Sequence, residues 1–206
     1  KSKTELIYLY LWDSEIIYPE IQQTLKYSNK IFTYDIEDAL TNGWIYKPMF
    51  YEKTSNEISN NIESYFCSYI AKFGFYRFLF CFMLVLKNNS KKFYFYFKFP
   101  INIHFKFFSS EFFLKKSSLN FDEVSKIYND SKYLLSISEF SKGGFTQRIY
   151  DSFCFKKKCI VNHKNINWDK DTLDNIIHFR NLKLDNGKFI NKGSQFFENK
   201  KIQFWI

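Results

Sequence analysis

Short apolar runs alternate along this chain with longer amphipathic stretches, and polar residues close most of the runs. The clearest strand-like runs are Leu6–Leu11, Ile31–Tyr34, Tyr133–Ser138 and Cys159–Asn162. Helical patterns follow three of these runs, at Ser14–Tyr27, at Asp38–Asn42 with Gly43 as its stop, and at Thr146–Lys156. Strands that alternate with helices are typical of βα units, so we expect an α/β fold with a largely parallel sheet.

The middle and the end of the chain give weaker patterns. The predicted elements are a segment Glu63–Ser68 that leads into an apolar helix ending at Leu86, a strand Lys92–Phe99, a helix Phe121–Asn129, a short helix and strand within Asp171–Leu184, and an amphipathic helix Gln195–Trp205. Asn102–Ser118 is aromatic and irregular, so no element is predicted there. No internal repeat is evident.

A polar stretch, Lys53–Asn61, follows Pro48 and predicts a linker or an excursion between domains. We therefore expect two units, residues 1–52 and residues 53–206. The chain begins at Lys1 rather than Met, so we expect a further N-terminal portion to precede it.

Composition changes this picture in one respect. Hydrophobic residues make up 46% of the 206 positions and charged residues 25%, which is ordinary, but aromatic residues reach 22%. Lys, Asn, Ile, Phe and Tyr are inflated together, which indicates an AT-rich genome rather than a functional demand. We therefore expect Phe to fill core positions where other chains use Leu.

The net charge of +9 would suit nucleic acid or an anionic bilayer. The charge is scattered, its densest cluster is Lys156–Lys158, and no recognition motif accompanies it, so we expect no nucleic-acid partner. The longest apolar run, Phe78–Leu86, is too short to span a bilayer and predicts a buried segment.

The four cysteines form no CxxC pair and predict reduced, buried residues in a cytoplasmic protein. The histidines (His104, His163 and His178) are dispersed, and no metal-ligand cluster is visible, so we expect neither a metal nor a cofactor.

Ser138–Lys158 is the segment that suggests chemistry. A strand ends in a loop with Gly143 and Gly144, and a helix opens at about Thr146. Paired glycines allow close approach of a ligand, and a helix N-terminus presents N–H groups that suit a diphosphate. Arg148 lies in the first turn, where a forked contact to an anionic oxygen is feasible, and Asp151 shares its helix face. The plainer alternative is a simple turn followed by a surface ion pair between Arg148 and Asp151.

The stretch Lys142–Ile166 resembles the donor-site segment of bacterial lipopolysaccharide-type glycosyltransferases of the GT-B class. Gly144–Arg148 stands where that family has Gly-Leu-Thr-Met-Arg, Asp151 stands where it has Glu, and Asn162 and Lys164 fall in its Thr-Asn-Lys-like continuation. Trp12-Asp13-Ser14, Thr33–Tyr51 and the terminal Phe204-Trp205-Ile206 are similar to further family segments, in the same order.

The resemblance implies a Rossmann-like GT-B fold, of which this chain would hold the tail of the N-terminal, acceptor-side domain and the complete C-terminal domain. It implies a nucleotide-sugar site at Gly143, Gly144, Thr146, Arg148 and Asp151, without a bound metal. Arg148 and the helix N-terminus would neutralise the departing diphosphate, and Asp151 would hold the ribose. Trp12 and Asp13 could line the cleft, and no catalytic residue is named because the acceptor side lies largely in the missing portion.

Two departures from the family pattern stand out. Asp151 is one methylene shorter than the family's Glu. The loop that opens the second domain in the family carries Gly after two apolar residues, whereas here Tyr65-Phe66 is followed by Cys67-Ser68, which predicts a more crowded phosphate site.

The resemblance implies transfer of a sugar from a nucleotide-sugar donor to a lipopolysaccharide or other surface-polysaccharide acceptor. The expected location is the cytoplasm, with peripheral contact at the inner face of the plasma membrane. The alternative is a non-catalytic remnant or accessory subunit of a glycosyltransferase. A third reading, a basic RNA- or DNA-binding module, rests on charge alone.

Overall fold

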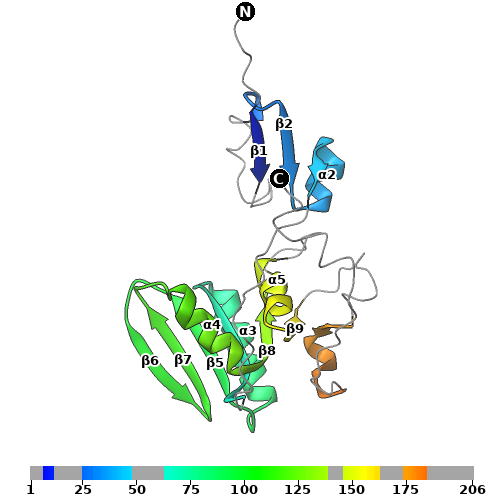
Figure 1. Ribbon diagram of the computed structural model, residues 1–206. Coiled ribbons are helices and arrows are strands. Elements are labelled where there is room, and N and C mark those ends of the chain that lie inside the picture. Colours follow the sequence, from blue (N-terminus) through cyan, green and yellow to red (C-terminus); the bar gives the residue numbers. More distant parts are fainter. Residues whose placement is uncertain (1–6, 12–24, 48–62, 139–145, 163–173, 185–206) are drawn as a thin grey trace, which may run out of the picture.

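The computed structural model describes residues 7–11, 25–47, 63–138, 146–162 and 174–184. They form two separate sheets, one within residues 8–46 and the other within residues 65–178. Figure 1 shows the smaller sheet above the larger one. The predicted linker Lys53–Asn61 and the predicted helices Ser14–Tyr27 and Gln195–Trp205 lie outside the described residues, in whole or in large part.

The smaller sheet is parallel and has the order β1 (Tyr8–Leu11), β2 (Lys30–Thr33), β3 (Ile45–Tyr46). Helix α2 (Ile36–Asn42) connects β2 to β3. Its N-cap is Asp35, whose carboxylate accepts hydrogen bonds from the backbone N–H groups of Glu37 and Asp38. Its C-cap is Gly43, which has φ 68°, a left-handed conformation that glycine adopts without strain. The sequence predicted β1, β2 and the glycine stop, but not β3.

The larger sheet has seven strands among the described residues, in the spatial order β10-β9-β8-β4-β5-β7-β6. The strands are β4 (Tyr65–Lys72), β5 (Phe93–Lys98), β6 (Ile103–Phe107), β7 (Ser110–Lys115), β8 (Ser131–Ser136), β9 (Lys158–Val161) and β10 (Ile176–His178). All neighbours run parallel except β6, which pairs antiparallel with β7. Without β6, the chain order of the strands across the sheet is 3-2-1-4-5-6, the order of a Rossmann-like doubly wound sheet.

Helices cover both faces of this sheet. Helix α3 (Phe75–Lys87) and the 3-10 helix η2 (Phe179–Leu184) pack on one face, against side chains that include Cys67, Leu135 and Ile160. Helices α4 (Phe121–Asn129) and α5 (Gln147–Cys154) pack on the other face, against Leu134 and Cys159. An α/β fold with a mostly parallel sheet is therefore confirmed.

Phenylalanine fills much of the core, as the composition predicted. Phe93, Phe95, Phe97 and Phe112 are fully buried, on two neighbouring strands. Their rings meet one another and the α3 side chains in tilted and edge contacts, such as the 4.9 Å between the ring centroids of Phe95 and Phe112. Aromatic pairs favour these geometries, so the Phe-rich composition is compatible with a specific packing.

Three expectations need correction. Asn102–Ser118, where no element was predicted, contains the β6–β7 hairpin. The alternation is hidden in β7, because Phe112 and Phe113 are adjacent and face opposite sides of that strand. The expectation that Phe78–Leu86 is buried is half wrong, since Leu79, Met83 and Leu86 are exposed on α3. In the segment Asp171–Leu184, the described part is the strand β10 followed by η2, so the helical turn comes after the strand.

Candidate functional site

The carboxyl end of β4 lies at the point where the chain changes direction across the sheet. From β4 the chain builds β5, β6 and β7 on one side, and it then returns through α4 to place β8 on the other side of β4. Open α/β sheets bind their ligands in the crevice at such a topological switch point. The residues that follow β4 and β8 are therefore the candidates for a site.

The predicted glycine loop connects β8 to α5 at this edge. Gly143 and Gly144 lie outside the described residues. Thr146 is the N-cap of α5, but its side chain makes no capping hydrogen bond. Instead its hydroxyl lies 2.7 Å from the Ser136 hydroxyl, at the end of β8. Thr146 thus joins the two ends of the loop and leaves the N-terminal N–H groups of α5 without a side-chain cap.

Arg148 reaches across the switch point from α5 to β4. Its Nε and Nη2 donate to the carbonyl oxygen of Ile70, at 3.0 and 2.8 Å. The guanidinium carbon lies 4.9 Å from the centroid of the Tyr69 ring, within the range of a cation–π contact. The pairing of β4 with β8 ends before Ile70, at Ser68 and Leu134, so the two strands separate where Arg148 enters. Both contacts hold the side chain in place, and its remaining N–H donors make no hydrogen bond within the described part of the chain, so they could donate to a ligand.

Asp151 is half-buried, one helical turn after Gln147, whose amide donates a hydrogen bond of 3.1 Å to its carboxylate. Burial raises the pKa of Asp151 to about 6, and the Gln147 amide and the charge of Arg148 oppose this shift. Arg148 and Asp151 are both described by the structure, and no ion pair joins them. The alternative of a surface ion pair between them is therefore wrong.

The first βα turn contributes residues that the sequence analysis missed. Cys67 and Ser68 do not form the loop that opens the second unit, since both are buried in the middle of β4 and do not crowd the carboxyl edge. The turn is Phe73-Gly74, and Gly74 is the N-cap of α3, without a side-chain cap. A glycine directly before a long apolar helix was the signal for this turn. The expected crowding of a phosphate site by Cys67 is therefore not found.

Asn162, which the resemblance singled out, fixes the ends of two strands. Its side chain accepts a hydrogen bond of 2.9 Å from the Ser138 backbone N–H and donates one of 2.8 Å to the Ser138 carbonyl. It also donates to the Tyr76 hydroxyl, at 3.2 Å, in the first turn of α3. Asn162 therefore links the segments that follow β8 and β9 to α3, at the edge where Arg148 lies.

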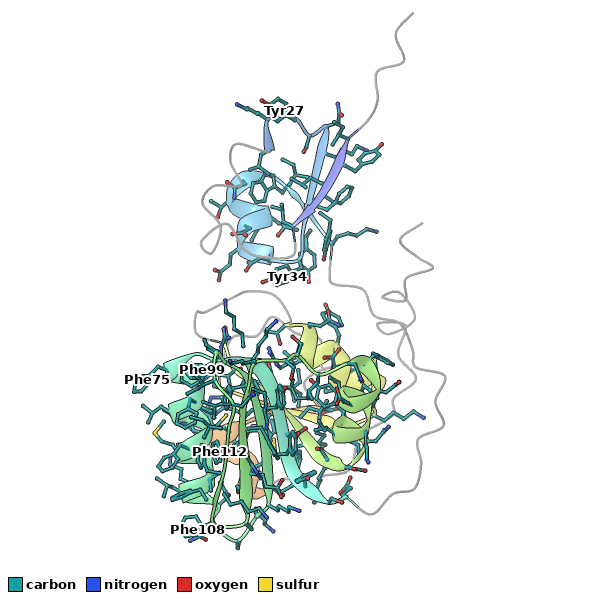
Figure 2. All side chains as sticks on the ribbon, turned by 90° about the vertical axis from the view of Figure 1, so that its left-hand side faces the viewer. Tyr27, Tyr34, Phe75, Phe99, Phe108 and Phe112 are labelled. Atoms are coloured by element: carbon teal, nitrogen blue, oxygen red, sulfur yellow. The ribbon has the colours of Figure 1, made fainter. Side chains whose placement is uncertain are left out.

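The smaller sheet contacts this edge through Tyr34. Tyr34 follows β2 and is only 4% exposed, because it packs in one cluster with Ile149, Tyr150 and Phe153 of α5. Figure 2 labels Tyr34 at the end of the smaller unit that faces the larger one. The carboxyl end of β2 thus lies against the helix that follows the carboxyl end of β8, and the two parallel sheets face each other by these edges.

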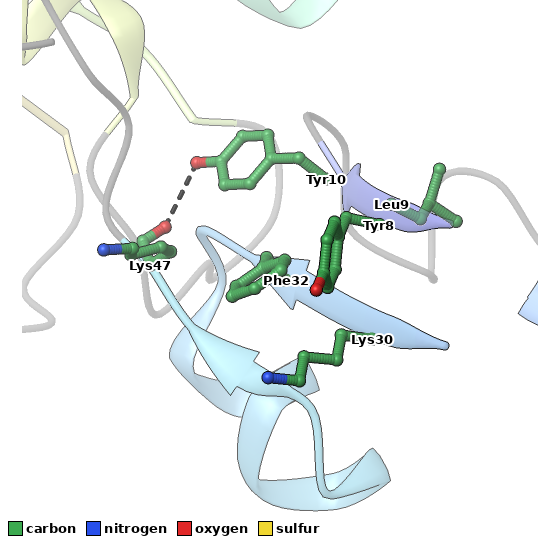
Figure 3. Close-up of a pocket in the computed structure, with 6 residues that line it drawn as sticks. All are labelled: Tyr8, Leu9, Tyr10, Lys30, Phe32 and Lys47. Carbon is green, nitrogen blue, oxygen red and sulfur yellow. Dashed lines mark hydrogen bonds between the residues drawn. The ribbon is translucent and has the colours of Figure 1, made fainter. Parts of the chain in front are cut away.

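Two of the cavities that described residues line adjoin these elements. The first, of about 370 Å³, lies on the smaller sheet and is lined by Tyr8, Leu9, Tyr10, Lys30, Phe32 and Lys47. Figure 3 shows the rings of Tyr8 and Phe32 next to each other, and the ring of Tyr10 turned toward Lys47. The Tyr10 hydroxyl donates a hydrogen bond of 3.1 Å to the Lys47 carbonyl oxygen. Tyr10 also packs against the Tyr34 cluster, so this cavity adjoins the contact between the units. The second, of about 280 Å³, lies between α3 and η2 and includes Tyr76, Asn162 and Arg180.

The described residues hold no cluster of side chains suited to a metal ion. None of the four cysteines forms a disulfide, and burial raises the pKa of each thiol, so that none is a thiolate at neutral pH. His104 of β6 stacks on Phe113 of β7, and His178 is the last residue of β10. His163 lies outside the described residues. Within the part of the chain that is described, no helix is both long and apolar enough to cross a membrane.

Comparison with known proteins gives no match: no family model, no curated protein and no solved structure is similar to this chain. The description of this protein therefore rests on its own structure, an α/β fold compatible with a Rossmann-like sheet, with a candidate anion site at the switch point.

Proposed function

We propose that this chain is the donor-binding part of a GT-B-type glycosyltransferase, which transfers a sugar from a nucleotide-sugar to a lipopolysaccharide or other surface-polysaccharide acceptor. The observation that carries the proposal is the position of Arg148. It lies on the first turn of an uncapped helix, at the switch point of a Rossmann-like sheet. The next two residues of this helix, Ile149 and Tyr150, pack against Tyr34 of the second parallel sheet. Nucleotides bind doubly wound sheets in this crevice.

The diphosphate of the donor would lie between the N-termini of α3 and α5. Both helices begin without a side-chain cap, at Gly74 and at Thr146, so their first N–H groups can donate to phosphate oxygens. Arg148 would add its free N–H donors while Ile70 and Tyr69 keep the guanidinium oriented. Such fixed donors stabilise the charge that develops on a departing nucleoside diphosphate without reorganisation during the reaction.

Asp151 would accept a hydrogen bond from the donor ribose. With a pKa of about 6, its carboxylate is largely ionised at neutral pH and becomes a neutral acid below pH 6. A charged acceptor forms the stronger hydrogen bond, so donor affinity is expected to fall as the pH drops through 6. The charge that Asp151 keeps in a half-buried position is consistent with a ligand-binding role.

The aromatic cavity on the smaller sheet suits the acceptor. Tyr8, Tyr10 and Phe32 offer ring faces on which sugar rings can pack, and Lys30 and Lys47 would pair with anionic groups of a polysaccharide. This cavity adjoins the Tyr34 contact, so donor and acceptor would approach from opposite sides of the junction between the two sheets.

A non-catalytic relative that binds a nucleotide-sugar without turnover is the second candidate. It is favoured by the short Asp151 side chain, whose contact within the described structure is the amide of Gln147. Calorimetric titration with UDP, GDP and CDP, followed by an assay for release of the nucleoside diphosphate from the matching nucleotide-sugars, tests both candidates. Binding with turnover supports the enzyme, and binding without turnover supports the relative. If none of the three binds at millimolar concentration, the proposal fails.

A further inference from the structure

Helix α3 carries apolar side chains on all sides, with Arg77 and Lys87 as its charged residues, yet the described residues cover only one side of it. Phe80, Cys81, Leu84 and Val85 are buried against the sheet. Apart from Lys87 at its end, the exposed side chains of α3 are large and apolar and form one continuous stripe along its length: Phe75, Tyr76, Leu79, Met83 and Leu86. A helix that is apolar all round is normally buried on all sides, so this stripe indicates a surface that something else covers.

The stripe extends onto the β6–β7 hairpin. Phe82, beside the stripe, stacks on Phe107 with 4.5 Å between the ring centroids, and Phe107 contacts Phe108 at 4.6 Å. Phe108 is exposed at the tip of the hairpin and has φ 52°, a left-handed conformation that is strained for a bulky residue. In Figure 2, Phe75 and Phe108 lie at the two ends of the same side of the larger unit. An exposed ring in a strained turn has no evident benefit for folding.

The chain segment that carries this surface has charge of one sign. Between Ser64 and Ser110 there is no acidic residue, whereas six lysines and one arginine occur, which account for 7 of the net charges of +9. Lys72 precedes α3, and Lys87 and Lys91 follow its exposed stripe, and all three are exposed. An apolar stripe with flanking lysines is typical of helices that lie in the interface of an anionic bilayer.

We propose that the α3 face, formed by the α3 stripe and Phe108, docks onto an anionic lipid bilayer. The apolar rings would enter the headgroup region along the length of the helix, and Lys72, Lys87 and Lys91 would pair with lipid phosphates. The docking residues are the exposed stripe, Phe108 and the lysines, and none of Thr146, Arg148 and Asp151 is among them. This inference therefore does not depend on the proposed function.

The chain offers a matched pair of residues for the test. Phe75 and Phe121 are each the first residue of a helix, are 74% and 62% exposed, and lie on opposite faces of the sheet. Glutamate is favourable in the first turn of a helix, so Phe75→Glu and Phe121→Glu should both fold. Flotation with vesicles of phosphatidylcholine and phosphatidylglycerol is the measurement, with pure phosphatidylcholine and added salt as further arms.

Wild type should bind the anionic vesicles, and salt should weaken this binding. Phe75→Glu should lower the partition coefficient by about tenfold or more, through lost apolar contact and added repulsion, whereas Phe121→Glu should change it by less than about twofold. Phe108→Gly should lower it by about threefold or more without lowering the melting temperature, because glycine relieves the strained turn.

Four results would overturn the proposal. Wild type does not bind anionic vesicles, or the variants Phe75→Glu and Phe121→Glu lose binding equally. A dimer that Phe75→Glu dissociates, without vesicle binding, would assign the face to a second copy. Binding that develops only after deletion of residues 185–206 would assign the face to that segment instead.

Discussion

Arg148 and Ile70 are 78 residues apart in the chain, and the guanidinium of Arg148 donates two hydrogen bonds to the Ile70 carbonyl oxygen. This contact ties the first turn of α5 to the end of β4, where β4 and β8 no longer pair. It places a permanent positive charge at the switch point of the sheet and orients it before any ligand arrives. Preorganisation of this kind lowers the entropic cost of binding.

The strand β8, which precedes the glycine loop, should contribute strongly to the stability of the fold. Leu135 is fully buried in the core between the sheet and α3, so Leu135→Ala should lower the free energy of unfolding by about 2–5 kcal/mol. Leu40, which is 80% exposed on α2, is the control, and Leu40→Ala should change it by less than about 0.5 kcal/mol. Denaturant titration measures both. A loss below about half a kilocalorie for Leu135→Ala would mean that β8 is misplaced.

The contact between the two sheets depends on Tyr34. Tyr34→Ala removes a buried ring from the cluster with Ile149 and Tyr150, so it should loosen α5. We expect faster amide hydrogen exchange in α5, on the order of tenfold, because local opening then costs less free energy. Tyr27→Ala, at an exposed tyrosine of the same unit, should leave the exchange of α5 unchanged. Equal exchange in the two variants would show that the sheets are not coupled through Tyr34.

The buried charge of Asp151 should cost stability at neutral pH. Its pKa is raised from 3.8 to about 6, so the folded state binds the proton more tightly than the unfolded state. Stability is therefore lost as the pH rises from about 4 to about 6, and this loss persists at pH 7. Asp151→Asn should raise the free energy of unfolding by about 1–2 kcal/mol at pH 7, with a smaller gain at pH 4. Urea titrations at the two pH values check this, and a gain that is equal at both would contradict the raised pKa.

The ribose assignment of Asp151 predicts the opposite effect on ligand binding. Asp151→Asn keeps the shape of the side chain but gives up the charge-assisted bond, so nucleotide affinity should fall by about 1–2 kcal/mol. Asp151→Glu gains one methylene and should leave the affinity unchanged or raise it. Calorimetry on both variants decides the point. An Asn variant that binds as well as wild type would remove Asp151 from the site.

Local signals in the sequence predicted much of the fold. Helix α4 begins and ends as predicted, because Asn120 and Glu123 form a capping box that fixes its start. Gly43 likewise marks the end of α2. The hairpin β6–β7 was missed because rings such as Phe112 and Phe113 face both sides of one strand. The exposed stripe of α3 was missed for a related reason, since periodicity does not reveal which side of an apolar helix is covered.

The candidate site was predictable only in its parts. The segment Thr146–Asp151 follows a buried strand, and this position together with the resemblance to the donor-site segment indicated Arg148. Its partners could not be predicted, because Ile70 and Tyr69 become neighbours of Arg148 only when β8 pairs with β4. Gly74 and Tyr34 joined the site for the same reason, through the order of the strands and the contact between the sheets.

The central claim is that a nucleoside diphosphate binds at Arg148. Calorimetric titration of Arg148→Ala and Arg180→Ala against wild type tests it most directly, since Arg180 lines the separate cavity between α3 and η2. Circular dichroism should first show that both variants are folded at the temperature of the titration. We expect Arg148→Ala to weaken the binding of the preferred nucleotide by about ten- to 150-fold, and Arg180→Ala to leave it nearly unchanged. Equal affinity in wild type and Arg148→Ala, or a loss confined to Arg180→Ala, would contradict the account.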